Sequence, residues 1–239
     1  MHFLFTFFLL LFFFTKDGWA QKGITLQAEP GLSFTQKFQG RWSFNGKSTM
    51  RYTFLTPEEE GIKKEATFNF NETLLFATYE FWNNVKVSGG YGFRIATLSE
   101  SPLFSEHRIM QQLGAVLYAR GGKRIANRLR LEQRIESSDY INRWRYRIGF
   151  DSPLDGQRLD PGEMYIILTN EFLWSFNRFE QNGENRLYAG VGWFFNSQYK
   201  LETGLQYRAS DIGPDMANTI WLTTLLYINR MQPQKKEVR

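Results

Sequence analysis

The stretch that decides the fold is Ile125–Phe150, IANRLRLEQRIESSDYINRWRYRIGF. Charged and large apolar residues alternate in it twice, on either side of a short break. Successive side chains of a β-strand point to opposite faces, so the alternation predicts two strands, each with a charged and an apolar face. The charged face collects seven side chains: Arg128, Arg130, Glu132, Arg134, Arg143, Arg145 and Arg147.

Most of the remaining chain repeats this two-faced pattern, and no segment has the periodicity of a helix that could cover the apolar faces. A closed barrel in lipid satisfies both faces, because its apolar side chains meet the membrane and its charges fill the lumen. One arginine turned toward lipid at mid-membrane costs about 2–4 kcal/mol. The three arginines of 141–151 therefore fix the inward direction of that strand.

We expect an all-β fold, an antiparallel transmembrane β-barrel in a single domain. The pattern shows eleven strands, but bacterial single-chain barrels close with an even number, so we predict twelve, with ten as the alternative. The visible strands cover about 24–36, 40–55, 66–82, 85–97, 106–120, 124–137, 141–151, 163–177, 185–196, 199–209 and 218–229.

The connections carry turn and loop residues. Tight turns are expected at Asn83-Asn84, Gly121-Gly122 and Ser197-Gln198. Longer polar loops are expected at Thr56–Glu65, Ser99–Ser105, Ser152–Gly162 and Ser210–Ala217. The alternation slips near Asn69, because Phe68 and Phe70 are out of phase with Tyr79 and Phe81, and this slip indicates a bulge or a turn.

The ends of the chain differ from the middle. Phe3–Phe14 is apolar and is followed by Gly18-Trp19-Ala20, the shape of a signal peptide that is cleaved after Ala20. As a helix this run would span about 18 Å, short of the roughly 30 Å hydrocarbon core. The predicted organisation is a signal peptide at 1–20, the barrel at 21–230 and a disordered charged tail at 231–239, in the outer membrane of a bacterium.

Composition argues against several classes of function. The net charge is +5, but the arginines alternate within strands and do not cluster on one helix or loop, so we exclude nucleic acid as a partner. The chain has no cysteine, and after the signal peptide only one histidine, His107, so neither a metal site nor any other cofactor is expected.

The predicted lumen is rich in cations with fewer acids. Its charges are Arg108, Arg128, Arg130, Glu132, Arg134, Arg143, Arg145, Arg147, Glu171, Arg186 and Glu202. The interpretation we favour is a salt-bridge network that plugs and rigidifies the barrel, since arginine can bridge two carboxylates and stays charged when partly buried. The alternative is a small pore that prefers anions, or a pocket for an anionic solute. The expected partners are outer-membrane lipid and that solute, and the sequence names no protein partner.

These residues also resemble a known family. Glu106-His107-Arg108-Ile109, the run Arg128–Arg134, Arg143–Arg147, Asn170-Glu171-Phe172 and Leu201–Gly204 are similar to the bacterial family catalogued as domain of unknown function 2490. The resemblance covers nearly all of the chain after residue 20, most clearly 104–209. It implies an outer-membrane barrel without an established activity, and it supplies no catalytic residue.

A third hypothesis is an enzyme. Ser105 and His107 share the outward face of one strand, an arrangement that a lipid hydrolase could use. No third group is evident on that face, and we expect no catalysis. Six tryptophans suit the aromatic girdles at the membrane interfaces: Trp42, Trp82, Trp144, Trp174, Trp193 and Trp221.

Overall fold

The computed structural model describes residues 24–38, 40–58, 61–98, 101–136, 139–212 and 216–231, and every regular element in these ranges is a β-strand. The strands are β1 Thr25–Lys37, β2 Trp42–Glu58, β3 Gly61–Trp82, β4 Val85–Leu98, β5 Ser101–Tyr118, β6 Arg124–Glu136, β7 Tyr140–Pro153, β8 Glu163–Phe176, β9 Gln181–Phe194, β10 Tyr199–Ser210 and β11 Ala217–Met231. The described ranges hold no helix that is long and apolar enough to cross a membrane.

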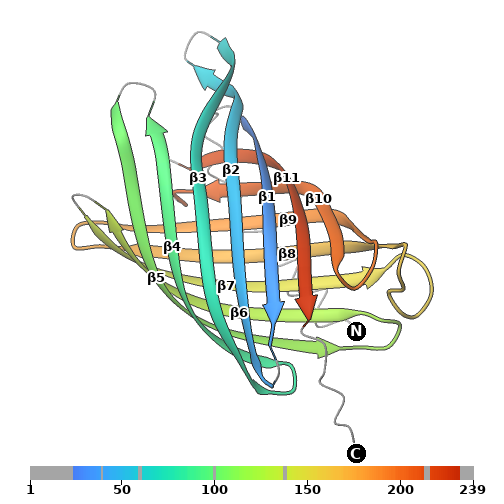
Figure 1. Cartoon of the computed structure of the whole chain (residues 1–239). Coiled ribbons are helices and arrows are strands. Elements are labelled where there is room, and N and C mark those ends of the chain that lie inside the picture. Colours follow the sequence, from blue (N-terminus) through green and yellow to red (C-terminus); the bar gives the residue numbers. More distant parts are fainter. Residues whose placement is uncertain are drawn as a thin grey trace, which may run out of the picture.

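The strands form one closed barrel in which each strand pairs with its neighbours in the sequence (Figure 1). All these pairings are antiparallel except the closing one, where β1 and β11 run side by side in the same direction. Their register runs from Thr25 opposite Thr219 to Lys37 opposite Met231. The fold class is therefore confirmed as a closed all-β barrel.

The predicted number of twelve strands, or ten, is wrong, because the barrel has eleven. Each range read from the sequence corresponds to one strand, so the error lies in the parity rule. In an up-and-down barrel with an odd number of strands, the first and last strands point the same way. They must then pair parallel, as β1 and β11 do.

The alternation slip near Asn69 is a β-bulge. Arg51 pairs with Phe70 and Tyr52 pairs with Phe68, so Asn69 is the extra residue opposite them. The bulge returns Phe70 to the interior, where it is buried. β3 continues through it as a single strand, so the alternative of a turn is excluded.

Two of the expected loops are wrong, because strands run through them. β2 extends to Glu58 and β3 begins at Gly61, so most of Thr56–Glu65 is a hairpin whose polar side chains lie in the open. β5 begins at Ser101, inside the expected loop Ser99–Ser105. Polar residues indicate exposure to water. A strand that extends beyond the barrel wall is exposed to water just as a loop is, so polar composition does not distinguish the two.

The three tight turns lie where the sequence predicts them, between β3 and β4, β5 and β6, and β9 and β10, and the described parts of the loops after β7 and β10 also connect strands. Asn84 adopts a φ of 68° in its turn, and Gly121 and Gly122 adopt 74° and 66°. The signal peptide expected at 1–20 and residues 232–239 of the expected tail lie outside the described residues. Met231, which we assigned to that tail, is the last residue of β11.

Candidate functional site in the barrel lumen

Most charges of the lumen come from the alternation of β5 to β10. Within β6 the side chains of Arg130, Glu132 and Arg134 are buried, whereas Leu129 and Ile135, which flank them in the sequence, are exposed on the outside. The predicted inward direction of the charges is therefore confirmed. β6 and β7 are neighbours, which brings the arginines of the two strands together.

Four pairs of arginines face each other directly across neighbouring strands. They are Arg108 and Arg134, Arg130 and Arg145, Arg128 and Arg147, and Arg186 and Arg208. Like charges directly opposite one another destabilise a sheet. Each pair therefore requires negative charge nearby, and the glutamates of the lumen supply most of it.

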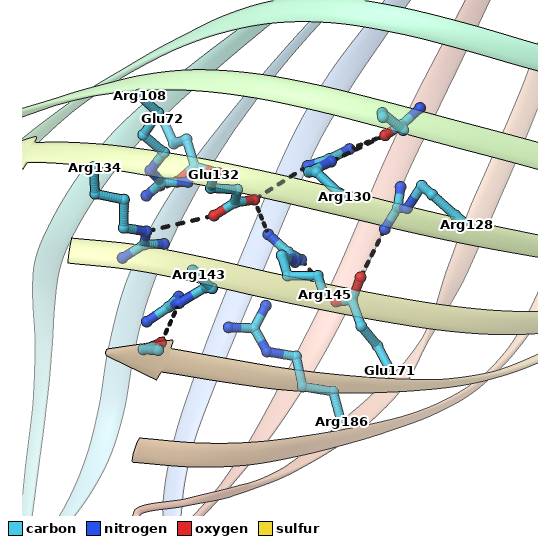
Figure 2. Close-up of polar contacts among 12 residues, drawn as sticks. Glu72, Arg108, Arg128, Arg130, Glu132, Arg134, Arg143, Arg145, Glu171 and Arg186 are labelled. Carbon is cyan, nitrogen blue, oxygen red and sulfur yellow. Dashed lines mark hydrogen bonds and ion pairs between the residues drawn. The ribbon is translucent and has the colours of Figure 1, made fainter. Parts of the chain in front are cut away.

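Glu132 is the centre of the network (Figure 2). Its side chain is 1% exposed and accepts hydrogen bonds from Arg145 at 2.8 Å and Arg134 at 3.4 Å. Arg130 lies 3.5 Å from the same carboxylate, so Glu132 bridges the Arg130–Arg145 pair. Arg130 also donates two hydrogen bonds to the side-chain oxygen of Gln112, at 2.7 and 2.9 Å.

Glu171 on β8 joins β6 to β7. Its Oε1 accepts a hydrogen bond from Arg128 at 2.8 Å, and its Oε2 accepts one from Arg145 at 2.7 Å. Arg145 therefore contacts two buried carboxylates, those of Glu132 and Glu171. Such charge-assisted bonds are stronger than neutral ones, so Arg145 is a main connection within the network.

A second part of the network spans β3 to β6. Glu106 forms ion pairs with Arg108 and Arg134, and thus bridges that pair. Glu72 pairs with Arg94 at 2.6 Å and with Arg108 at 2.7 Å. Arg108 is 1% exposed, so its charge is compensated by the protein and hardly by water.

A third part surrounds a tryptophan inside the barrel. Glu184 bridges Arg186 and Arg208, and Glu29 pairs with Arg51. The guanidinium carbon of Arg51 lies 3.7 Å from the ring centre of Trp221, a cation–π geometry. Trp221 is 1% exposed, so its predicted place in a membrane girdle is wrong. Its position in the alternation of β11 turns it inward, onto the arginines.

Glu202 lies apart from these arginines. Its carboxylate accepts hydrogen bonds from the hydroxyls of Tyr165 at 2.6 Å and Tyr227 at 2.8 Å, and from Lys200 at 2.9 Å. The sequence predicted its inward direction correctly. It grouped Glu202 with an arginine network that the structure places elsewhere.

Three inward cations have no carboxylate within ion-pair distance in the described ranges: Lys47, Arg143 and Arg147. Arg143 donates a hydrogen bond of 2.6 Å to the hydroxyl of Ser175. The lumen of the described barrel thus carries more positive than negative charge.

Several residues of the network are absent from the lumen residues that the sequence predicts. Glu184 precedes the predicted strand 185–196, but β9 begins at Gln181 and so includes it. Glu72 lies next to the bulge, which hides its phase. Glu29 and Arg51 are isolated charges in weakly patterned strands, and only the barrel register brings them together with Trp221.

Ser105 and His107 lie on β5 in the outward phase, as expected. The Nδ1 atom of His107 is 2.5 Å from the hydroxyl of Tyr91, and its ring lies 5.0 Å from that of Phe93. No hydrogen bond joins Ser105 to His107 in the part of the chain that the structure describes. Among the same residues no group of three or more metal-ligating side chains occurs.

The outer face carries the apolar residues of the alternation. Trp144 of β7, for example, is 58% exposed. The exposed aromatic side chains include Trp42, Trp82, Tyr91, Trp144, Tyr146, Phe172 and Trp174. Large apolar side chains exposed in such number are unusual on a soluble monomer. The described barrel therefore has a charged interior and an apolar exterior.

The family model described as protein of unknown function (DUF2490) matches residues 30–216. No curated protein and no solved structure matches the chain.

Proposed function

Because this chain belongs to the DUF2490 family, for which no function is known, we propose its role from the barrel itself. We propose that it is an outer-membrane β-barrel of bacteria whose Arg/Glu network plugs and rigidifies the lumen. The observation that carries the proposal is the buried carboxylate of Glu132, which contacts Arg130, Arg134 and Arg145 from two neighbouring strands.

The outer face supports the membrane location. Closed barrels and helices are the structures that satisfy their backbone hydrogen bonds in lipid, and this barrel has no open edge. Its exterior holds exposed aromatic and aliphatic side chains where a soluble barrel would hold polar ones. The signal peptide expected at 1–20 would direct export across the inner membrane, which an outer-membrane location requires.

The size of the barrel supports a filled interior. Barrels of about eight strands are filled by their own side chains, whereas those of 16–18 strands enclose an aqueous channel. Eleven strands lie nearer the small end, and the long side chains of arginine extend into the lumen from several walls. A network across these walls fixes the strands relative to one another and narrows the passage.

Cell fractionation tests the location. We expect the full chain, expressed in a Gram-negative host, to sediment with the outer membrane and to resist extraction by sodium carbonate. The chain without residues 1–20 is the control, and we expect it to remain in the cytoplasm. Recovery of the full chain in the soluble periplasmic fraction would contradict the proposal.

Single-channel recording in a planar bilayer tests the plug. We expect the refolded barrel to be silent or nearly so in a salt gradient. Arg145→Ala and Glu171→Ala should lower the stability without a gain of solute flux if the network only supports the wall. Steady openings of the unmodified barrel would contradict the plug.

A second candidate function is a small anion-selective pore or an anion pocket. The observation that favours it is the surplus of inward cations, including Arg147 without a paired carboxylate in the described ranges. A steady conductance with anion preference would support it. The preference should weaken or reverse when Arg128, Arg130 and Arg145 are neutralised.

We infer that the protein does not catalyse a reaction. The hydrolase hypothesis requires His107 and Ser105, and the ring nitrogen of His107 is close to Tyr91. Release of fatty acid from phospholipid vesicles measures that activity. A turnover that is lost in both His107→Ala and Ser105→Ala would contradict this inference.

A further inference from the structure

The four opposed arginine pairs are not equivalent. Glu106 bridges Arg108 and Arg134, Glu132 bridges Arg130 and Arg145, and Glu184 bridges Arg186 and Arg208. The fourth pair, Arg128 and Arg147, has no carboxylate that contacts both members. Within the described ranges Arg147 forms neither an ion pair nor a hydrogen bond.

Glu171 does not bridge this pair. It lies directly opposite Arg147 on β8, but its Oε1 contacts Arg128 and its Oε2 contacts Arg145, and within the described ranges it forms no ion pair with Arg147. The Nε–H of Arg128 is buried and has no hydrogen-bond partner among the described residues. A buried donor without a partner destabilises the fold, so this place favours an additional acceptor.

Two further side chains on other walls lie within electrostatic reach of this pair. Lys47 on β2, across the barrel from β7, is closest in electrostatic terms to Glu29 and Glu72, whose carboxylates pair with other arginines. It is also within electrostatic reach of Arg147 and Arg128. Tyr188 on β9 lies within electrostatic reach of Arg147, and its hydroxyl makes no hydrogen bond within the described ranges.

We propose that Arg128, Arg147 and Lys47 bind a dianionic oxyanion, a phosphate or a phosphate monoester, in the lumen. Its oxygens take the place that a glutamate carboxylate holds at the other three pairs. Two negative charges match Arg147 and Lys47, which both lack an ion pair in the described part of the chain, as does Arg143 elsewhere on β7. The planar fork of arginine suits such bidentate recognition of oxyanions.

This inference deepens the second candidate function and rests on its premise that anions enter the lumen. It does not require conduction, because a closed pocket would bind as well. If the barrel conducts anions but does not bind phosphate, the proposed site is wrong and the second candidate function stands. Phosphate binding by a silent barrel would keep the site and favour the pocket.

Thermal unfolding and calorimetric titration of the refolded barrel in detergent test the site. Inorganic phosphate at pH 8 should raise the unfolding temperature above that in chloride of equal ionic strength. Arg147→Gln should weaken the phosphate affinity by at least about tenfold, the loss expected for one hydrogen bond to a charged group. Lys47→Gln repeats the test from the opposite wall, in case Arg147→Gln fails to fold.

Arg143→Gln is the matched control, because it removes the same charge from the same strand at an arginine that is hydrogen-bonded to Ser175. We expect it to keep the affinity within about threefold, and an equal loss in both variants would overturn a localised site. Equal stabilisation by chloride would overturn it too.

Glycerol phosphate, a soluble stand-in for a lipid headgroup, identifies the source of the ligand. Binding of both probes supports a site for free phosphate, and binding of glycerol phosphate alone supports a site for a headgroup. Failure of both overturns the proposal.

Discussion

At the scale of single residues, the main feature of the lumen is that glutamates compensate arginines that face one another. Arginines stand opposite arginines on neighbouring strands, and buried glutamates between them make the arrangement tolerable. Removing one partner of a buried ion pair leaves the other charge uncompensated, whereas removing both can be nearly neutral. The contribution of each side chain therefore depends on how many carboxylates it contacts.

Arg145→Ala should be the most damaging of the arginine substitutions, because it leaves both Glu132 and Glu171 with one cation fewer. We expect a loss of about 3–5 kcal/mol in the free energy of unfolding, the usual effect of breaking a buried pair. Urea titration of the barrel in lipid vesicles measures it. Arg178→Ala in the exposed turn between β8 and β9 is the control and should change the stability by less than about 0.5 kcal/mol.

Trp221→Ala should destabilise the barrel by about 3–5 kcal/mol, because it opens a cavity at a buried aromatic residue and removes the ring beneath Arg51. Trp82→Ala is the matched control, since that ring is 72% exposed. The same urea titration compares the two. Equal effects would contradict the inward position of Trp221.

At the scale of the strand, β4 shows how small residues make room for the lumen. A Cβ atom at Gly90 would lie 2.4 Å from the ring of Phe76 and 2.9 Å from the carbonyl oxygen of Leu75. At Gly89, which faces outward, a Cβ atom would meet nothing within 4 Å. The inward glycines of β4 therefore allow side chains of the neighbouring strands, such as Phe76 of β3, to pack against its backbone.

Gly90→Ala should cost about 1–3 kcal/mol, the typical penalty for overpacking, whereas Gly89→Ala should be close to neutral. The two positions are adjacent in one strand, so the comparison cancels any effect of alanine on strand propensity. Unfolding midpoints in urea give the difference. If both substitutions cost the same, the close contact with Phe76 would not be the cause.

Strands and their inward faces could be predicted from the sequence, because alternation is local and every arginine on the wrong face would be costly. Which charged side chains contact one another could not be predicted from the sequence. Glu72 and Glu184 join the network only through the register between strands, and a bulge or a strand end hides their phase. Trp221 shows the same limit, since a tryptophan can face either lipid or an arginine.

At the scale of the whole molecule, closure depends on one parallel pair. β1 and β11 are far apart in the sequence, and no local pattern reveals that they pair in the same direction. The even-number rule led to a wrong strand count for this reason. The parallel register makes a prediction that a barrel of twelve antiparallel strands would not satisfy.

The paired variant Thr35→Cys with Asn229→Cys should form a disulfide on mild oxidation, because the two residues are register partners. The chain has no cysteine of its own, so the product is unambiguous. Thr35→Cys with Thr223→Cys is the control, about 20 Å away along β11 at the usual rise per residue, and should stay reduced. A gel shift under non-reducing conditions distinguishes the two.

The parallel closure also has a consequence for sidedness. A wall that the chain crosses eleven times begins at one rim and ends at the other, so Thr25 and Met231 lie at opposite openings of the barrel. In a membrane these openings face two different compartments. Thiol-reactive dyes that cannot cross lipid should therefore label cysteines at these two positions from opposite sides of the membrane. The labelling pattern would then show the orientation in which the barrel was inserted.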